Sequence, residues 1–475
     1  MDNKIFDYLE SVHGITPPRA YYARIAEWNA WRRGFYKPFH EFSESSVGGV
    51  PMKRELYRLN MAQKICEDWA SLLLSERTYV YSADSATSEW IGGRDGLHGF
   101  IGESGLIRRG TRLVEKAFAL GTGAAILRLD RVNYADGRLI RSPGARIRVD
   151  FVDAEHIVPI STDAHGITEA AFVSEVNERG REIVYVELHR LGDDGYVITN
   201  EWLEMCDGEL VPCEHSRRVP REIHTGSRVP LFAILTPNVT NYIDEVHGMG
   251  VSVYAQAIDC LKGVDLAFNN FCRDLKLGGK KVFMNRSLVM RDGQGNIFTP
   301  DDVAQQLFVT VGDSDLSEDT MITEHNPSLR TEENSDAVQH QLDYLSFRCG
   351  LGTRHYLFSG VQGKAQLTAT QYTGERQDLI QNTARHRLNV EEFLVAIVRG
   401  ALWAAANVLG YPVDETAPLA VRFDDSYFID SESERGRDRA EVASGLMQPY
   451  EYRMKWRGES EDVAKSMVQS IDTQV

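Results

Sequence analysis

Cysteine is scarce in this chain and never forms a paired motif. The 475 residues include six cysteines: Cys66, Cys206, Cys213, Cys260, Cys272 and Cys349. None of them belongs to a CxxC pair, and the spacing of Cys206 and Cys213 matches no zinc-binding pattern. The sequence therefore predicts reduced thiols, with neither a disulfide framework nor a zinc site.

Catalytic motifs are also missing. No HExxH or GxSxG sequence occurs, and the thirteen histidines show no ligand spacing. Gly363-Lys364 has the last two residues of a phosphate-binding loop, but Ala365 and Phe358 stand where that loop requires Ser or Thr and a further glycine. Nucleotide hydrolysis is therefore not indicated, and we expect no cofactor and no metal site.

One alternative involves a metal. Asp301-Asp302, Asp313 with Asp315, and Asp424-Asp425 would supply carboxylate ligands to a metal-dependent nuclease if they converged in the fold. Loops and helix caps collect aspartate for ordinary structural reasons, so a structural role is the first expectation for each pair.

Basic residues are fewer than acidic ones. Lys and Arg number 52 against 69 Asp and Glu, which gives a net charge of −17. A protein that clamps nucleic acid without sequence preference is normally basic. The composition therefore argues against a tight DNA clamp, but it is compatible with a surface past which DNA slides.

Long hydrophobic runs are lacking as well. The first eight residues do not combine a basic start with an apolar stretch, so no secretory signal is expected. The most apolar run, 393–409, contains Arg399 and Asn407 and is about 17 residues long, the lower limit for a membrane helix. We predict a helix that is buried or faces another copy of the chain, and no membrane association.

The chain does contain an ordered series of helix and strand patterns. Its length exceeds the ~250–300 residues that one hydrophobic core serves, so two or more domains are expected. The fold class is predicted to be α+β, with a mainly antiparallel sheet that ends near Pro237. Helices are predicted at 19–34, 53–75 and 106–119, and strands at 124–132, 146–152, 157–159, 170–175, 183–191, 195–203 and 209–211.

Two amphipathic helical segments enclose a charged insert in the middle of the chain. Apolar residues recur at helical spacing over 253–275, and a second helix is predicted over 332–347. Gly278 and Gly279 follow the first segment, and glycine readily adopts the left-handed conformation that ends helices, so a sharp stop is predicted there. Within the insert, the turn signal Asp292-Gly293 predicts a hairpin of strands 282–285 and 296–298.

The sign of the charge changes abruptly across this insert. Residues 261–291 hold seven Lys or Arg against two Asp, whereas 299–345 hold eleven Asp or Glu against Arg330 alone. Such blocks are usually solvated faces. Alternatively, the basic patch of one copy meets the acidic patch of its neighbour in a ring.

A glycine-rich stretch and a long helix follow. Glycines at 350, 352, 360 and 363 permit mobility and close backbone approach. A helical pattern then runs to Leu409, with Gly374 as a weak point, and Gly410 and Pro412 end it.

Several stretches spread over nearly the whole chain resemble those of one protein family. They are 61–76 (MAQKICEDWASLLLSE), 115–123 (EKAFALGTG), 153–160 (DAEHIVPI), 249–253 (MGVSV) with 259–265, 368–371 (TATQ), 423–426 (FDDS), and 445–447 (GLM) with 452–456 (YRMKW). None is a catalytic signature, so the specificity lies in their order and number. Through them the chain resembles the portal proteins, or head-to-tail connectors, of long-tailed double-stranded DNA bacteriophages of Gram-positive hosts.

The resemblance implies a homo-oligomeric ring, usually a dodecamer, that forms a channel at one capsid vertex for DNA packaging and ejection. It implies a portal fold with a wing of helices and antiparallel sheet, a helical stem, a small α/β clip and a helical crown. The segments would be the wing at 1–248, a stem helix at 249–277, the clip at 278–330, a second stem helix at 331–351, the tunnel loop at 352–366, a long helix joining wing to crown at 367–409, and a C-terminal wing or crown segment at 410–475.

The resemblance also implies partners and a location. The partners would be further copies of the chain, double-stranded DNA, the large subunit of a separate terminase ATPase, a head-completion adaptor, and the major capsid and scaffolding proteins. The protein would belong to the virion and assemble in the cytoplasm of a bacterial host. A negative conduit suits this role, because strong attraction of phosphates would stall the passing DNA.

Five residues are candidates for contacts in this setting. Gln362, Lys364 and Gln366 would face DNA in the tunnel loop, because one long cation and two amides can touch phosphates without reading bases. Lys364 could instead pair with a neighbouring carboxylate. Lys280 and Lys281, just beyond the predicted helix stop, would contact a partner or DNA at the clip. Two other functions stay open, a metal-dependent nuclease and a monomeric minor capsid protein.

Overall fold

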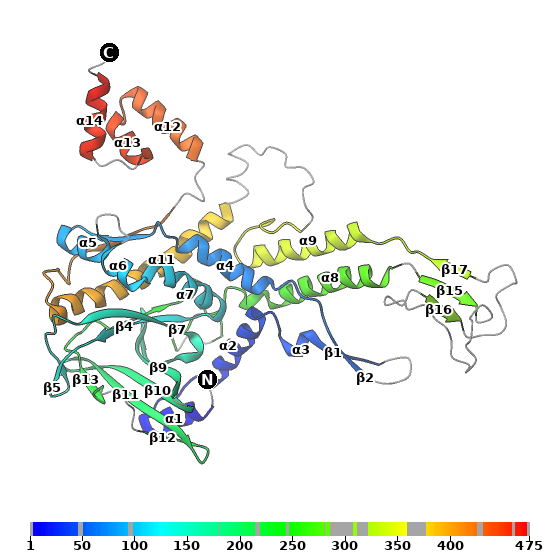
Figure 1. The fold of residues 1–475 in the computed structure, drawn as a ribbon, viewed down its shortest axis with the longest axis horizontal. Coiled ribbons are helices and arrows are strands. Elements are labelled where there is room, and N and C mark those ends of the chain that lie inside the picture. Colours follow the sequence, from blue (N-terminus) through cyan, green and yellow to red (C-terminus); the bar gives the residue numbers. More distant parts are fainter. Residues whose placement is uncertain are drawn as a thin grey trace. The chain divides into compact units, whose positions relative to one another are not determined.

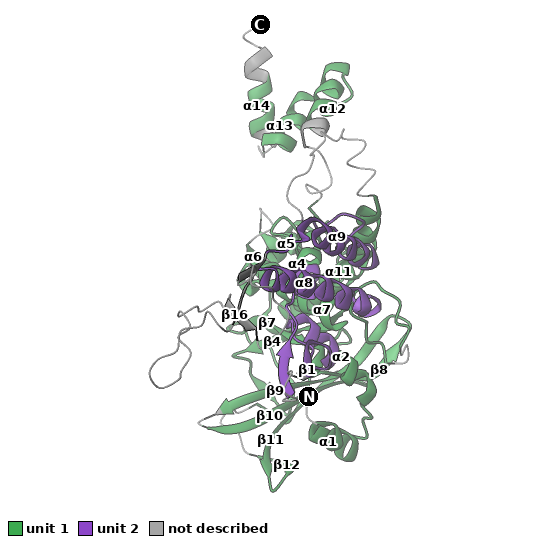
Figure 2. Cartoon of the chain, turned by 90° about the vertical axis from the view of Figure 1, so that its right-hand side faces the viewer, with its two compact units in different colours: residues 1–25, 66–252, 365–475 green, residues 26–65, 253–364 purple. Residues whose placement is uncertain are grey.

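The chain forms two compact units, each assembled from separate stretches of sequence (Figure 2). Unit 1 comprises residues 1–25, 66–252 and 365–475, and unit 2 comprises residues 26–65 and 253–364. The computed structural model describes residues 3–45, 51–93, 98–178, 180–213, 219–243, 247–279, 281–285, 307–310, 322–358, 377–424, 431–457 and 461–472. Two helices contribute residues to both units: α2 (Arg19–Arg32) and α4 (Met61–Leu73).

Two sheets form the centre of unit 1. The larger has the strand order β5-β6-β13-β11-β10-β9-β8, with β12 added beside β11, and the smaller has the order β14-β4-β7. Neighbouring strands are antiparallel except for β13 and β6. The strands are β4 (Gly123–Asp130), β5 (Tyr134–Ala135), β6 (Arg138–Leu139), β7 (Arg146–Asp153), β8 (Ile157–Asp163), β9 (Gly166–Glu178), β10 (Arg181–Gly192), β11 (Gly195–Cys206), β12 (Glu209–Pro212), β13 (Glu222–His224) and β14 (Phe232–Leu235).

A hydrophobic core lies between these sheets. Ala124 and Ile126 of the small sheet are buried with Phe172 and Tyr196 of the large one, and Phe232 packs edge-on against Phe172 with ring centroids 5.3 Å apart. Apolar side chains at alternate positions face one side of a strand, so this alternation lets each sheet bury one face against the other.

Helices cover the outer face of the small sheet. Figure 1 shows α7 (Leu106–Leu120) and α11 (Gln377–Ala404) on one side of β4 and β7, with the large sheet on the other. The approach is close at Gly400, where an added Cβ atom would lie 2.9 Å from the carbonyl oxygen of Pro230. Because β4 is covered on both faces, five of its eight residues in a row are fully buried.

Further elements complete unit 1. A π-helical turn (Ala405–Leu409) ends α11, and β3 (Tyr79–Ser82) pairs with β18 (Leu419–Arg422). The remaining helices are α1 (Asn3–His13), α5 (Ser85–Gly92), α6 (Gly99–Ser104), α12 (Ser431–Ser444), α13 (Pro449–Arg457) and α14 (Glu461–Asp472). The helix from Gln377 to Leu409 is long and apolar enough to span a membrane, but 61% of its most apolar window is buried inside the protein, as predicted for a packed helix.

Unit 2 is built around two long helices. These are α8 (Ile258–Leu277), preceded by a 3-10 turn (Ala255–Ala257), and α9 (Thr331–Arg348). A small sheet of order β16-β15-β17 follows α8 and precedes α9, with β15 (Lys281–Asn285) parallel to β16 (Leu307–Thr310) and antiparallel to β17 (Ile322–His325). The other elements are α3 (Lys37–His40) and the antiparallel pair β1 (Glu41–Ser45) and β2 (Pro51–Glu55).

Most of the predicted elements are confirmed. The α+β class is correct, the helices predicted at 253–275 and 332–347 correspond to α8 and α9, and the strand series from 124 to 211 corresponds to β4 and β7 to β12. The long helix predicted to end at Leu409 corresponds to α11 and its π-helical turn; its first predicted residues, including Gly374, lie outside the described residues.

The helix predicted over 53–75 is wrong in its first part. Residues 51–55 form β2, and the helix begins only at Met61. The reason lies in unit 2, where the amide of Tyr57 donates to Asn269 and that of Leu59 donates to Asp265. Because these amides are bound to side chains of α8, this stretch stays extended until Asn60, whose φ is 54°.

The helix stop at Gly278 is confirmed but for a different reason. α8 ends at Leu277, yet Gly278 has a φ of −78° and does not adopt the left-handed conformation. Glycine is needed because a Cβ atom there would lie 2.3 Å from the side chain of Leu329 and 2.7 Å from the carbonyl oxygen of Asp274. In the hairpin predicted next, the strand 282–285 is present, but 296–298 lies outside the described residues.

An uncharged histidine lies in the core of unit 1. His386 of α11 packs against Trp69 and Phe118, with ring centroids 4.7 Å and 5.0 Å away, and its Nδ1 accepts from the amide of Asn238 at 3.1 Å. Burial, assisted by the charge of Arg385, lowers the pKa of His386 to about 4. The folded state therefore favours the neutral ring, with the proton on Nε2.

Acid should destabilise unit 1 through this residue. Because the folded pKa of about 4 is below the model-peptide value of 6.5, the contribution to stability is complete above pH 6.5 and is lost as pH falls toward 4. In chemical unfolding, the wild type should lose about 3 kcal/mol more than H386N between pH 7 and pH 4. Equal pH dependence in the two proteins would show that His386 does not resist protonation in the fold.

Candidate functional site

The pair of long helices α8 and α9 is the central feature of unit 2 (Figure 1). The helices pack side by side through buried residues that include Leu261 and Val264 of α8 and Val338 and Leu342 of α9. At Gly263 the missing Cβ atom leaves room for the Gln341 side chain, whose oxygen lies 2.4 Å from where that atom would be. The two helices thus form a packed antiparallel pair.

A carboxylate fixes the register of the two helices. Asp274 near the end of α8 accepts hydrogen bonds from the backbone amide and the guanidinium of Arg330, at 3.3 Å and 2.9 Å, and from the side-chain amide of Asn334 at 3.0 Å. The hydrogen bond from the Arg330 side chain is the largest of the effects that lower the pKa of Asp274. The last turn of α8 is thus held level with the first turn of α9.

A second carboxylate of α8 holds the β1–β2 hairpin. Asp265 is buried, accepts from the amide of Leu59 at 2.8 Å, and contacts Nε2 of the buried His40 at 3.0 Å. The Nδ1 of His40 lies 2.8 Å from the amide nitrogen and 3.1 Å from the carbonyl oxygen of Tyr36, so both ring nitrogens have partners. One turn later, Asn269 binds the amide of Tyr57. The hairpin is therefore anchored to α8 at two successive turns.

Several large apolar side chains of the helix pair are exposed to solvent. Leu266 and Leu277 of α8 are 44% and 54% exposed, and Tyr344 and Phe347 of α9 are 63% and 56% exposed. Scattered exposed leucines are ordinary, but two aromatic residues one turn apart on one helix are more typical of an interface.

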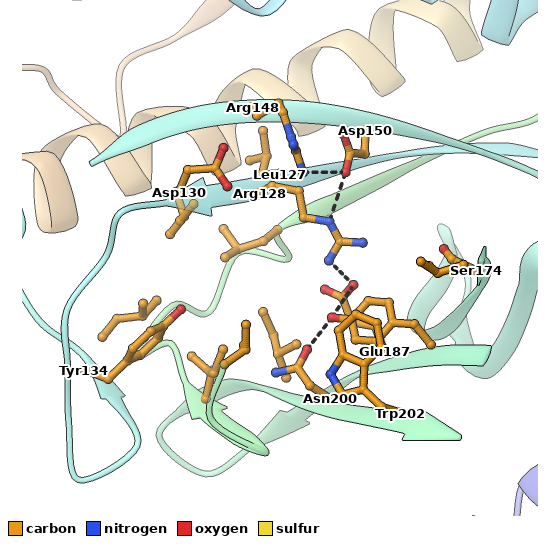
Figure 3. Close-up of a pocket in the computed structure, with 18 residues that line it drawn as sticks. Leu127, Arg128, Asp130, Tyr134, Arg148, Asp150, Ser174, Glu187, Asn200 and Trp202 are labelled. Atoms are coloured by element: carbon orange, nitrogen blue, oxygen red, sulfur yellow. Dashed lines mark hydrogen bonds and ion pairs between the residues drawn. The ribbon is translucent and has the colours of Figure 1, made fainter. Parts of the chain in front are cut away.

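Unit 1 contains a separate pocket of about 560 Å³ (Figure 3). It opens between the two sheets, with Arg128 from β4, Glu187 and Tyr185 from β10, and Asn200 and Trp202 from β11 among the side chains that line it. The ring of Trp202 stacks on that of Tyr185 at 4.2 Å, and the Tyr185 hydroxyl donates to Asn200 at 2.6 Å.

The charged groups of this pocket neutralise one another. Arg128 forms ion pairs with Asp150, at 3.3 Å, and with Glu187, which is only 3% exposed; His189 also contacts Glu187, at 2.8 Å. Burial alone would raise the pKa of Glu187, but the charge of Arg128 and the hydrogen bond with His189 outweigh it and hold the value at about 2. Burial raises the pKa of Tyr185.

This arrangement does not suit acid–base catalysis. Glu187 remains ionised and Tyr185 remains protonated across the physiological range, so neither exchanges a proton near neutral pH. Within the described ranges, no group of three or more His, Cys, Asp or Glu side chains is placed to hold a metal ion. The pocket is therefore best described as an ion-paired polar interior between two sheets.

The residues predicted from the sequence lie mostly outside the described part of the chain. This holds for Gln362, Lys364 and Gln366, for Lys280, and for Asp301, Asp302, Asp313, Asp315 and Asp425. Lys281 is placed by its backbone as the first residue of β15, opposite His325 of β17. Asp424 lies 3.5 Å from the hydroxyl of Ser75.

Other residues were missed by sequence reasoning. The buried carboxylates of Asp265 and Glu187 bind partners more than fifty positions away in the chain, at His40 and Arg128 respectively. A local pattern carries no signal for such pairs. The only hint for Asp265 was its place among the apolar residues of a predicted amphipathic helix.

The ion pair in the pocket can be tested through stability. Replacing Arg128 by Met leaves a buried carboxylate that keeps His189 and the more distant Tyr185 hydroxyl as partners but loses its counter-charge. R128M should therefore lower the unfolding free energy by about 3 kcal/mol. The double variant R128M/E187M removes both charges and should lie within about 1 kcal/mol of the wild type. Chemical denaturation measures both. If R128M alone proved as stable as the double variant, the pair would not hold the two sheets together.

Comparisons with known proteins give no likeness in sequence and a distant likeness in structure. No family model matches the chain, and no curated protein matches it in sequence. Among solved structures, the neck of a native GTA particle computed with C12 symmetry aligns over 83% of this chain and 88% of the other, with 12% identity and a TM-score of 0.35. An overlap of this extent and quality carries no argument about function, which has to come from the chain's own features.

Proposed function

We propose that this chain is the portal protein of a tailed double-stranded DNA phage or a related particle. In this proposal, copies of the chain form a ring around a channel at one capsid vertex, through which DNA is packaged by a separate terminase and later ejected. Adaptor proteins of the head-to-tail junction would dock on the same ring.

The α8–α9 hairpin is the observation that carries the proposal. It is a tightly packed antiparallel helix pair, joined at one end to a small sheet and flanked by exposed Leu266, Leu277, Tyr344 and Phe347. A channel stem requires such a unit, because each copy must present apolar and polar side faces to its neighbours. The portal-like order of motifs along the chain supports the same function.

The remaining assignments belong to this proposal. The β15–β17 sheet would be part of the clip, the sheets of unit 1 the wing, and residues 352–366 the tunnel loop. The protein would have no enzymatic activity of its own. Lys281, together with Lys280, would contact a partner at the clip.

The assembly state is the first test. Native mass measurement and negative-stain imaging of the purified chain should show a ring of about a dozen copies with a central hole. A species at the chain mass of 53.5 kDa at every concentration would contradict the proposal and favour the monomeric minor capsid alternative. If the pure protein cut DNA with magnesium or manganese, the nuclease alternative would stand instead.

The tunnel loop is tested by a charge reversal. K364E places a negative charge where DNA would pass, and phosphate repulsion should reduce packaging or retention of DNA while rings still assemble. Packaging assays with K364E and the milder K364Q measure the effect. Wild-type packaging and retention by K364E would show that this charge does not face the DNA.

A further inference from the structure

The α8–α9 pair and the β1–β2 hairpin form a layer with two different edges. Both views show α8 between α9 and strand β1 (Figures 1 and 2), all within unit 2. α9 therefore forms one edge of this layer. The hairpin, with the adjoining face of α8, forms the opposite edge.

The hairpin edge is a basic groove of about 360 Å³. We define this basic groove by Lys53, Arg54, Arg273 and Lys276, over apolar side chains that include Phe42 and Met52. Lys53 and Arg54 already pair with Glu41 and Glu44, and Glu55, which also lines the groove, pairs with Arg58. Within the described part of the chain, Arg273 and Lys276 form no hydrogen bond or ion pair through their side chains, so their charges are available.

The α9 edge is acidic. We define this acidic edge by Glu332 and Asp336, which are exposed and four residues apart, so they stack on one side of the helix one turn from each other. Neither carboxylate pairs with any residue that the structure describes. The exposed Phe347 continues the same side of α9 toward its C-terminal end.

The two edges lie at the same height along the helices. Hydrogen bonds from Arg330 and Asn334 to Asp274 hold the first turn of α9 level with the last turns of α8, where Arg273 and Lys276 lie. In a ring whose axis is parallel to these helices, neighbouring copies are related by rotation about the axis. Equivalent residues then lie at the same level along the axis in every copy. The acidic edge of one copy then arrives opposite the basic groove of the next.

We infer that the acidic edge of one copy docks into the basic groove of a second copy of this chain. Glu332 and Asp336 would pair with Arg273 and Lys276 of the neighbour, and apolar groups on both edges would be covered. The contact joins two different surfaces, so it repeats head to tail and closes only in a ring. This inference rests on the proposed function, and it names the contact by which the ring forms.

Complementary charge reversals test the pairing. R273E/K276E makes both edges acidic and E332K/D336K makes both edges basic, so each variant alone should need at least about tenfold more protein than the wild type to assemble. An equimolar mixture of the two should assemble again, with the variants alternating, because each groove then meets an edge of opposite charge. The chain carrying all four changes should also assemble. Native mass measurement gives the assembly state of each variant and of the mixture.

Controls separate this contact from general effects. D193K/D194K makes the same change of charge as E332K/D336K at the exposed turn between β10 and β11 and should assemble like the wild type. Thermal melting should fall only slightly for the single-edge variants, because E332K and K276E each reverse a charge that complements a helix end but disturb no buried core. High salt should weaken the repulsion and partly restore assembly.

Several results would overturn the inference. If both single-edge variants assembled fully, the inference would be wrong. The proposed function would still stand, because the wild type would still form a ring. Failure of the mixture to assemble would mean that the two edges do not meet. Loss of DNA retention in R273E/K276E with intact rings would assign the groove to phosphates instead. A monomeric wild type would instead refute the proposed function itself.

Discussion

The antiparallel pairing of α8 with α9 is the constraint on which the rest of unit 2 depends. Two helices that bury one face against each other must present their remaining faces outward, and the antiparallel course decides which ends lie together. Asp274 fixes this register through Arg330, and Asp265 fixes the hairpin on the far side of α8. Arg273 and Lys276 of α8 and the carboxylates of Glu332 and Asp336 of α9 thereby lie on opposite edges of one layer.

A pair of glycines positions the chain where it leaves unit 1 for this layer. An added Cβ atom on Gly121 would lie 2.1 Å from the carbonyl oxygen of Gly250, and one on Gly250 would lie 2.3 Å from that of Gly121. The hydroxyl of Thr122 accepts from the amide of Gly250 at 3.0 Å. Two stretches that carried the family resemblance thus meet in space, which gives a packing reason for their glycines.

Elements that bury residues at a regular spacing could be predicted from the sequence. Elements whose structure depends on contacts between distant residues could not. The bounds of α9 were predicted to within one residue and those of α8 to within five, because burial imposes the helical period. β2 was missed because all five of its residues are exposed and show no alternation. The contact of Asp265 with His40 joins positions 225 apart, beyond any local pattern. The change of charge along the sequence was visible, but the placement of Arg273 and Lys276 opposite the carboxylates of α9 depends on the observed pairing of the helices.

The contact at Gly263 would have a geometric consequence in the proposed ring. The missing Cβ atom leaves room for the tip of the Gln341 side chain, whose oxygen lies 2.4 Å from the position of that atom. In such a ring, the separation of the two helices would contribute to the width of each copy, and that width would be the step by which successive copies advance around the circumference. The residues packed between α8 and α9 would thereby help to set the bore of the proposed channel.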